Sequence, residues 1–417
     1  MSLLSPTSAF ARVTALASQR PVHAAFAWLH TNSKTIMDWQ MQLVAIPAPN
    51  LCEQARAQWL AQRLGEAGLS HVQLDDVGNV LAIMPATTIP PESSGPVVLL
   101  SAHLDTVFPV GTPIPLAFDS ERLVAPGACD NAAGVVGMLA IVHSLLHARV
   151  ELPAPIVVLG NVGEEGEGDL RGVRHFYRQN PMAGRVAAHI VLDGPGSDGA
   201  VTQALGSLRF QVKICGPGGH SFTDAGIPNP IVALARALTI LAETPLSETL
   251  RTTLNVGTIS GGISVNSIPE SAQALVDFRS TEPGQLSQLE AALRRAVADA
   301  VENSNAKSRD ADNRGKLSFT ISKIGDRPAA CLPDDSPLLA ALRAVDRHLA
   351  LRTDLRLGST DANLPLSLGV PALSIGAGGE GGAAHTLHEW YSPNGRELAL
   401  KRVLLLTLAT AEWAAGQ

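Results

Sequence analysis

Apolar runs alternate with helical stretches over most of the chain. Residues 95–105 (GPVVLLSAHLD), 154–165 (APIVVLGNVGEE) and 186–194 (VAAHIVLDG) are each rich in Val, Ile, Leu and Ala. Such runs are typical of strands buried on both faces, as in parallel sheets covered by helices. Residues 131–150, between the first two runs, have the length and apolar content of a buried helix. The pattern therefore predicts an α/β fold with a mostly parallel sheet covered by helices.

The pattern changes between residues 206 and 325. SLRFQVKIC alternates strictly between apolar and polar side chains, and the strands and helices that follow complete the order βαββαβ. Half-exposed strands in this order predict a ferredoxin-like sandwich with its helices on one face. The buried-strand pattern returns at 369–379 (GVPALSIGAGG). We therefore expect a larger domain in two parts, 1–205 and 326–417, with the ferredoxin-like domain 206–325 inserted between them.

Composition narrows the class of protein. The chain has 417 residues, of which 46% are hydrophobic and 17% charged, and its net charge is −7. This length favours two domains. The acidic balance, with no basic run, disfavours nucleic acid and anionic membranes as partners. No apolar stretch reaches the roughly 18 residues that a membrane-spanning helix needs.

The four cysteines are Cys52, Cys129, Cys215 and Cys331, and none forms a CxxC pair. Their wide spacing argues against a zinc–thiolate site and against a disulfide framework. It is typical of a reducing compartment, and the first residues lack the pattern of a secretory signal. We therefore expect a cytoplasmic protein. We interpret Cys129 as a small apolar filler rather than a redox group.

Side chains that commonly bind metal ions follow the predicted strands. These side chains are His103, Asp105, Glu164, Glu165, Asp193 and His385. Asp130 lies at the entrance of the helix predicted over 131–150. Because ligands in open α/β sheets bind beyond the carboxyl ends of the strands, we expect these side chains to meet at one edge.

Imidazole and carboxylate ligands without thiolate suit zinc, with manganese or cobalt as substitutes. The set is too large for one tetrahedral catalytic site. It suits two metal ions about 3.5–4 Å apart that share one carboxylate. Two such ions would stabilise the clustered acids of GEEGEGD (163–169), in which we expect Glu167 and Asp169 to be solvated or helix-entry acids.

The motifs HLDTV, GACDNAAG and GEEG, then Asp193, then AHTLHE occur in this order over the chain. This ordered set resembles the co-catalytic dinuclear zinc exopeptidases, which include glutamate carboxypeptidase, tripeptidase T, acetylornithine deacetylase and succinyl-diaminopimelate desuccinylase. The resemblance extends from about residue 35 to the end of the chain. GSTDANLP (358–365) is similar to the tripeptidase-like branch.

The resemblance implies a role for each matching residue. His103 and Asp193 would bind one zinc ion, Glu165 and His385 the other, and Asp130 would bridge them. His388 would not be a ligand, because the family spacing places the ligand four residues before Glu389.

Further roles of the larger domain follow from the same resemblance. Asp105 would orient the His103 imidazole. Glu164 would be the general base that deprotonates the water between the metals and returns the proton to the leaving amine. The resemblance also implies a cis peptide bond between Asp130 and Asn131.

The inserted domain carries two further matching motifs. In GPGGHSFTDAG, His220 would reach the partner subunit's active site and stabilise the oxyanion. In GGISVNSIPESAQALVDFR, Asn266 and Arg279 would bind substrate. The resemblance also implies a homodimer formed through this domain.

These observations predict a dinuclear zinc hydrolase, most simply an exopeptidase that acts on short peptides. An N-acyl amino-acid deacylase would use the same machinery, and the direction of exopeptidase action stays open. A dinucleotide-binding oxidoreductase is a remote alternative, because GAGGEG (376–381) satisfies G-x-G-x-x-G. That match lies outside any opening βαβ unit. The chain has no G-x-S-x-G elbow, which disfavours a serine hydrolase.

Overall fold

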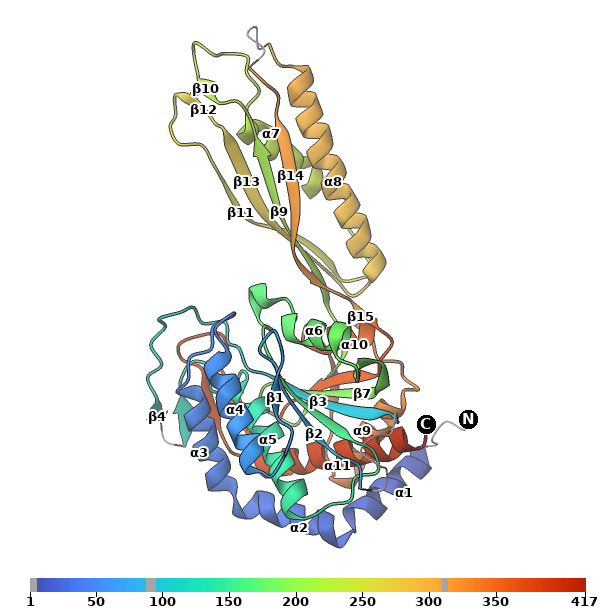
Figure 1. Ribbon diagram of the computed structural model, residues 1–417. Coiled ribbons are helices and arrows are strands. Elements are labelled where there is room, and N and C mark those ends of the chain that lie inside the picture. Colours follow the sequence, from blue (N-terminus) through green and yellow to red (C-terminus); the bar gives the residue numbers. More distant parts are fainter. Residues whose placement is uncertain (1–5, 88–94, 120, 310–313) are drawn as a thin grey trace. The chain divides into compact units, whose positions relative to one another are not determined.

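The computed structural model describes residues 6–87, 95–119, 121–309 and 314–417 (Figure 1). It contains two compact units. The first unit comprises the chain up to Ala204 together with Cys331–Gln417, and the second comprises Leu205–Ala330. The predicted larger domain begins at residue 1, and its residues 1–5 lie outside the described part.

The main sheet of the first unit has the strand order β1-β2-β6-β3-β7-β17-β8-β15, and β16 pairs with β8. Its strands are β1 (Gln73–Leu74), β2 (Val80–Met84), β3 (Val97–His103), β6 (Ile156–Asn161), β7 (Val186–Leu192), β8 (Gly199–Ala204), β15 (Ala330–Cys331), β16 (Asp354–Gly358) and β17 (Ala372–Ile375). The four central strands, β6, β3, β7 and β17, pair in parallel, whereas β2 and β8 run antiparallel to their neighbours β6 and β17. The predicted mostly parallel sheet is confirmed, and the four apolar runs form its centre.

Helices cover this sheet. They are α1 (Pro6–Ala17), α2 (Arg20–Thr31), α3 (Ser33–Val44), α4 (Gln54–Glu66), α5 (Ala132–His147), α6 (Arg171–Gln179), α9 (Pro337–His348), α10 (Asn363–Ser367) and α11 (Arg396–Ala415), with short 3-10 turns at Gly166–Gly168 and Ala183–Arg185. Helices α5 and α11 pack on β3 and β7. Val173 and Phe176 of α6 join Leu364 of α10 in a buried cluster with side chains of β3 and β6. Among the described residues, no helix combines the length and the apolarity needed to cross a bilayer.

A second, smaller sheet of the first unit runs in the order β18-β19-β5-β4. Its strands are β4 (Ala117–Asp119), β5 (Arg122–Val124), β18 (Glu380–Gly382) and β19 (Trp390–Ser392). In the pairing of β5 with β19, Val124 lies opposite Trp390. This sheet therefore joins the segment that leads to Asp130 to the segment that carries His385.

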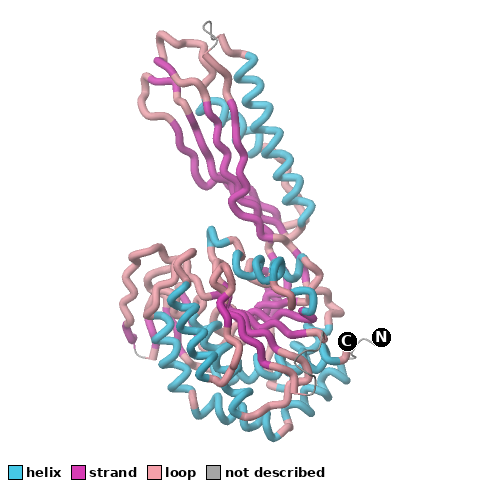
Figure 2. The backbone as a smooth tube through the Cα atoms, viewed as in Figure 1, coloured by secondary structure: helices cyan, strands magenta, loops and turns pink. Residues whose placement is uncertain are grey.

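The second unit contains β9 (Gly206–Cys215), α7 (Pro230–Ala242), β11 (Thr252–Gly261), β13 (Ser271–Ser280), α8 (Pro283–Ala306) and β14 (Ser318–Arg327). The strands form one antiparallel sheet in the order β11-β13-β9-β14. Figure 2 shows these strands and the two helices. The order of elements and of strands confirms the predicted ferredoxin-like sandwich.

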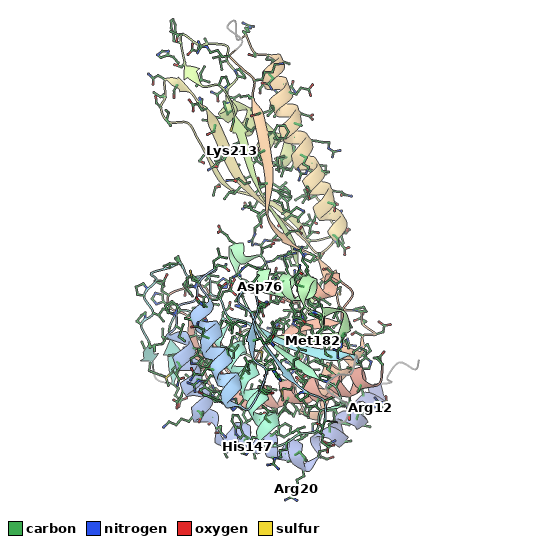
Figure 3. The ribbon with its side chains drawn as sticks, in the orientation of Figure 1. Arg12, Arg20, Asp76, His147, Met182 and Lys213 are labelled. Carbon is green, nitrogen blue, oxygen red and sulfur yellow. The ribbon has the colours of Figure 1, made fainter. Side chains whose placement is uncertain are left out.

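The alternation along β9 has the predicted effect. Its apolar side chains are buried in one cluster with side chains of α7 and α8: Leu208, Phe210, Val212 and Ile214. Lys213, on the other face of the strand, is exposed (Figure 3). A short ladder pairs β10 (Gly219–His220) with β12 (Ser267–Ile268) in the same unit.

Candidate metal centre

The carboxyl ends of neighbouring strands place candidate ligands at one edge of the main sheet. His103 is the last residue of β3, and Glu164 and Glu165 lie in the turn that follows β6. Asp193 follows β7, and its N–H donates to the carbonyl of Ile375, the last residue of β17, over 3.0 Å. Parallel pairing therefore brings together side chains that lie far apart in the sequence.

Asp130 lies between two histidines. Its Oδ1 is 3.1 Å from Nε2 of His103, and its Oδ2 is 3.0 Å from Nε2 of His385. The same His103 nitrogen is 3.7 Å from Oδ1 of Asp193, and the same His385 nitrogen is 3.1 Å from Oε1 of Glu165. The five side chains form two groups of three, each with ligand atoms within 4.8 Å of one another, and Asp130 belongs to both groups.

This donor set fits two divalent cations. Each group offers one imidazole nitrogen and two carboxylates without thiolate, which suits zinc and also manganese or cobalt. Asp130 directs one oxygen to each histidine, as a carboxylate shared by two ions would. Glu164 belongs to a third group with His103 and Glu165, so its carboxylate lies beside the other two groups. The structure thus brings together all five side chains that the sequence indicated as ligands, and Glu164 with them.

Burial and mutual attraction shift several pKa values in this cluster. Although burial opposes it, hydrogen bonds to neighbouring aspartates raise the pKa of His103 well above its ordinary value. Burial would raise the pKa of Asp130, but hydrogen bonds from His103 and His385 lower it below its ordinary value. Burial raises the pKa of Glu165 to about 7, and the hydrogen bond to Asp130 raises that of His385 to about 9. A cation that enters the cluster would therefore displace protons.

Asp105 joins two of the ligand-bearing turns. Its fully buried carboxylate accepts the N–H groups of Glu164 and Glu165 over 2.9 and 2.8 Å. Nδ1 of His103 lies 3.2 Å from the main-chain oxygen of Asp105 and 3.6 Å from its Oδ1. Burial would raise the pKa of Asp105, but its contacts with His103 hold it below the usual value. Asp105 is therefore placed to fix both the imidazole and the turn that carries the glutamates.

Glu389 plays a similar part in the Asp130 segment, a role that the sequence alone does not indicate. Its fully buried Oε1 accepts the N–H groups of Cys129 and Asp130 over 2.8 and 2.7 Å. Its Oε2 accepts the N–H of Gly127 over 2.9 Å. The signal that could have identified Glu389 is its place in AHTLHE, four residues after His385.

Asn131 ties the same segment to the end of β7. Its Oδ1 accepts the N–H groups of Gly134, at the start of α5, and Gly194, each over 3.0 Å. Its Nδ2 donates to the carbonyl of Leu192 over 2.9 Å. The peptide bond between Asp130 and Asn131 is cis, which confirms the implication of the resemblance. Asn131 thus fixes the separation of Asp130 from Asp193.

Asp361 is a second buried acid that the sequence reasoning missed, although it lies in the GSTDANLP motif. Its Oδ2 accepts the side-chain amide of Asn161 over 2.7 Å, and burial raises its pKa to about 7. Asn161 pairs with His103 across β6 and β3. Asp361 therefore lies behind the cluster rather than among its ligand groups.

Other acidic and imidazole groups of these loops stay outside the cluster. His388 and Glu167 are exposed, and neither belongs to the candidate ligand groups of the described residues. Asp169 forms an ion pair with Arg174, with Oδ2 and Nη2 3.3 Å apart. Burial raises the pKa of the Cys129 thiol, so the thiol stays protonated.

In the second unit, the β10–β12 ladder brings His220 close to Asn266. His220 pairs with Ser267, and the N–H of Ser221 donates to the main-chain oxygen of Asn266 over 3.0 Å. Both His220 and Asn266 are exposed. Nδ1 of His220 accepts the N–H of Phe222 over 3.2 Å.

Arg279 lies near the opposite end of the second unit's sheet. It is the penultimate residue of β13, where it pairs with Ser207 and Thr253, whereas Asn266 precedes β12. Its Nε donates to Oδ2 of Asp277 over 2.8 Å. Within this unit, Arg279 therefore does not join His220 and Asn266.

Comparison with known proteins identifies the family to which the chain is similar. The model of "Peptidase family M20/M25/M40" matches residues 99–409, which is more than half of the chain. A "Probable carboxypeptidase" of Aspergillus clavatus is 30% identical over 292 residues, which cover 64% of this chain and 63% of that protein. The chain thus spans somewhat less than two thirds of the length of this relative.

Solved structures share the fold. A tripeptidase from Staphylococcus aureus superposes with a TM-score of 0.72 at 20% identity, and the match covers 93% of this chain and 99% of that chain. A Bacillus subtilis protein described as a dinuclear metal binding peptidase superposes with a TM-score of 0.64 at 16% identity, covering 90% of this chain and 97% of that one. Both matches extend over the two units described above.

Proposed function

The chain belongs to peptidase family M20/M25/M40, and on this premise we propose that it is a metal-dependent exopeptidase that cleaves amide bonds of short peptides. The observation that carries the proposal is the pair of donor groups that share Asp130. The metals we propose are two Zn²⁺ ions, with Mn²⁺ or Co²⁺ as substitutes.

We assign the ligands by the two groups. His103 and Asp193 would hold one ion, Glu165 and His385 would hold the other, and Asp130 would contribute an oxygen to each. Bound there, the ions would supply Lewis-acid chemistry that polarises the scissile carbonyl and lowers the pKa of the attacking water. Asp105 and Glu389 keep the ligand-bearing turns in place through their hydrogen bonds to main-chain N–H groups.

Glu164 is the group that we propose moves the proton. It is 5% exposed and lies beside His103 and Glu165. Its carboxylate takes a proton from the attacking water as the new carbon–oxygen bond forms. It then gives that proton to the amide nitrogen as the carbon–nitrogen bond breaks. A carboxylic acid and a free amine leave, and Glu164 returns to its starting state.

The second unit supplies the remaining groups in this proposal. Because Nδ1 of His220 accepts a main-chain N–H, the proton of the neutral ring sits on Nε2, which would donate to the developing oxyanion in the active site of the partner subunit. Asn266 and Arg279 bind substrate, and the planar fork of Arg279 suits a substrate carboxylate.

We also propose that the protein is a homodimer formed through the second unit. Four strongly exposed apolar side chains in this unit support the proposal: Phe222, Ile259, Ile263 and Val265. Strand β11 is an edge of its sheet, and an edge strand favours pairing with a second chain. Sedimentation analysis tests this point: we expect twice the mass of one chain, and a monomer at micromolar concentration would contradict it.

We propose the cytoplasm as the compartment of this protein. The structure forms no disulfide among its described residues, which include all four cysteines. This suits a reducing environment.

One assay tests the proposed activity. The zinc-reconstituted protein is incubated with a mixed set of dipeptides, tripeptides and N-acyl amino acids, and the products are identified by mass spectrometry. We expect cleavage of peptides that is lost with a chelator and restored by Zn²⁺. Cleavage of N-acyl amino acids alone would show that the protein is a deacylase rather than a peptidase. An NAD-dependent absorbance change would favour an oxidoreductase.

A further inference from the structure

A buried arginine lies behind the candidate metal centre. Arg56, on α4, is 1% exposed. Its Nε donates to the carbonyl of Ile46 over 2.8 Å, and its Nη1 donates to the carbonyl of Leu104 over 3.1 Å. Leu104 is the residue between His103 and Asp105. One edge of the guanidinium therefore holds the turn that carries the first candidate ligand.

The other edge of the guanidinium faces the Asp130 segment. A Cβ atom placed on Gly127 would lie 3.4 Å from Nη2 of Arg56, so the guanidinium lies against this glycine. The N–H of Gly127 is held by Glu389. Nη2 itself has no hydrogen-bond partner among the described residues. Arg56 thus touches both turns that bring His103 and Asp130 together.

The two carboxylates that organise these turns are buried: Asp105 has His103 as an ion-pair partner, with Nδ1 and Oδ1 3.6 Å apart, and among the described residues Glu389 forms no ion pair. Asp105 and Glu389 are both 0% exposed, and each holds main-chain N–H groups. Burial lowers the pKa of Arg56 to about 10, while the attraction of Asp105 and Glu389 opposes this lowering. The guanidinium therefore stays charged at neutral pH. In a medium of low dielectric constant, a cation shared by two nearby anions offsets part of the cost of burying all three.

We propose that Arg56 is a positioning residue of the metal centre, a shared counter-charge for Asp105 and Glu389 that holds the His103 turn and the Asp130 segment in register. Its contacts with the carbonyl of Leu104 and with Gly127 place it where these two segments meet. Among the described residues it forms no hydrogen bond to a candidate ligand side chain, so its role is to hold the segments that carry the ligands. The inference rests on the proposed function, because it assumes that the cluster binds metal.

The chain offers a matched control in Arg402. This residue of α11 is also fully buried, and it forms an ion pair with Asp346, with Nε and Oδ1 2.6 Å apart. It also donates to Oγ1 of Thr353. Its loss should weaken the packing of α9 and α11 without reaching the metal centre.

The test measures Zn²⁺ affinity by competition with a chromogenic chelator, together with the melting temperature of the metal-free protein. We expect Arg56→Met to weaken Zn²⁺ binding by about 10–100-fold, the range seen when groups behind metal ligands are lost. Arg402→Met should lower the melting temperature. It should change Zn²⁺ affinity by less than about twofold, because Arg402 shares no hydrogen-bond partner with the metal centre. Equal affinities for wild type and Arg56→Met would overturn the inference.

A double-mutant cycle with Glu389→Gln separates shared charge from simple packing. If Arg56 compensates Glu389, the loss of Zn²⁺ affinity caused by Glu389→Gln should be at least about fivefold smaller in the Arg56→Met background than in wild type. Independent losses that simply multiply would contradict the inference. If Arg56→Met does not fold, Arg56→Gln, which keeps amide donors without the charge, carries the same cycle. A wild type that binds no Zn²⁺ would instead overturn the proposed function itself.

Discussion

The two regions that carry the candidate catalytic groups are built in opposite ways. In the first unit, the ligand-bearing turns are fixed by buried carboxylates, since Asp105 and Glu389 are both 0% exposed and accept two and three main-chain N–H groups. In the second unit, His220 and Asn266 are exposed and are held by a two-residue ladder. The candidate ligands of the first unit are thus held by buried hydrogen bonds, whereas the candidate groups of the second unit lie on an exposed surface.

Changing Glu164 should have the largest effect on turnover. For Glu164→Gln we expect kcat to fall by about 10²–10⁴-fold, because the amide cannot accept the proton of the attacking water. Metal content, measured by elemental analysis, should equal that of wild type. The matched control is Glu167→Gln, an exposed residue of the same motif, which should keep kcat within about twofold. Wild-type turnover in Glu164→Gln would remove its role as base.

Changing His220 sharpens the contrast between the two regions. His220→Ala should lower kcat by about 10²–10³-fold, the usual cost of one oxyanion donor. Because His220 is exposed and belongs to the other unit, its loss should leave Zn²⁺ affinity and melting temperature unchanged. Steady-state kinetics, calorimetry and thermal melting check these three points. A variant that loses metal rather than turnover would show that the second unit also supports metal binding, which contradicts the contrast between the two regions.

Changing Glu389 tests whether the buried hydrogen bonds of the first unit support metal binding. In Glu389→Gln, one oxygen that accepts main-chain N–H groups becomes an amide donor that faces a donor. We expect Zn²⁺ affinity to fall by about 10–100-fold, because Asp130 is no longer held in position. A chelator competition assay measures the change. Unchanged affinity would show that the Asp130 segment needs no such support.

Metal binding should also depend on pH, through the ligand groups of the first unit. The pKa of His385 is raised to about 9, so below that pH the imidazole carries a proton that Zn²⁺ must displace. Affinity should therefore rise by more than about tenfold between pH 7 and 8, because the raised pKa of His103 adds a second displaced proton. The rise should be steeper still below pH 7, where Glu165 with its pKa of about 7 also binds a proton. Calorimetry in a pH series checks the slope. A flat profile would contradict protonated ligands in the metal-free cluster.

The smallest effect is expected at His388. It lies three residues after His385 but is exposed and outside the candidate ligand groups of the described residues. His388→Ala should change Zn²⁺ affinity and kcat by less than about twofold. A loss of metal in this variant would mean that the two histidines had been assigned the wrong way round.

Much of the fold could be predicted because its signals are local. The apolar runs that became β3, β6, β7 and β17 are continuous, and the alternation along β9 fixes which of its faces is buried. The small sheet that pairs β5 with β19 was missed, because three-residue strands leave no periodic signal. Helices α1 and α2 were not predicted either, and they precede residue 35, where the resemblance begins.

The candidate ligands and Asp105 could be identified because strand ends and motif order place them, but the other supports could not. Glu389, Arg56 and Asp361 are buried charged groups whose partners lie far away in the chain. A charged residue in a sequence is usually exposed, so only the motif positions of Glu389 and Asp361 distinguish them from surface charges, and nothing local distinguishes Arg56. Only the folded chain shows which charges face inward.

Anomalous diffraction at the zinc absorption edge, from crystals of the zinc-reconstituted protein, shows directly whether two metal ions share Asp130. We expect two peaks about 3.5–4 Å apart on either side of the Asp130 carboxylate, one beside His103 and one beside His385. A single peak, or zinc bound away from Asp130, would contradict a shared two-metal centre and the hydrolytic function proposed from it.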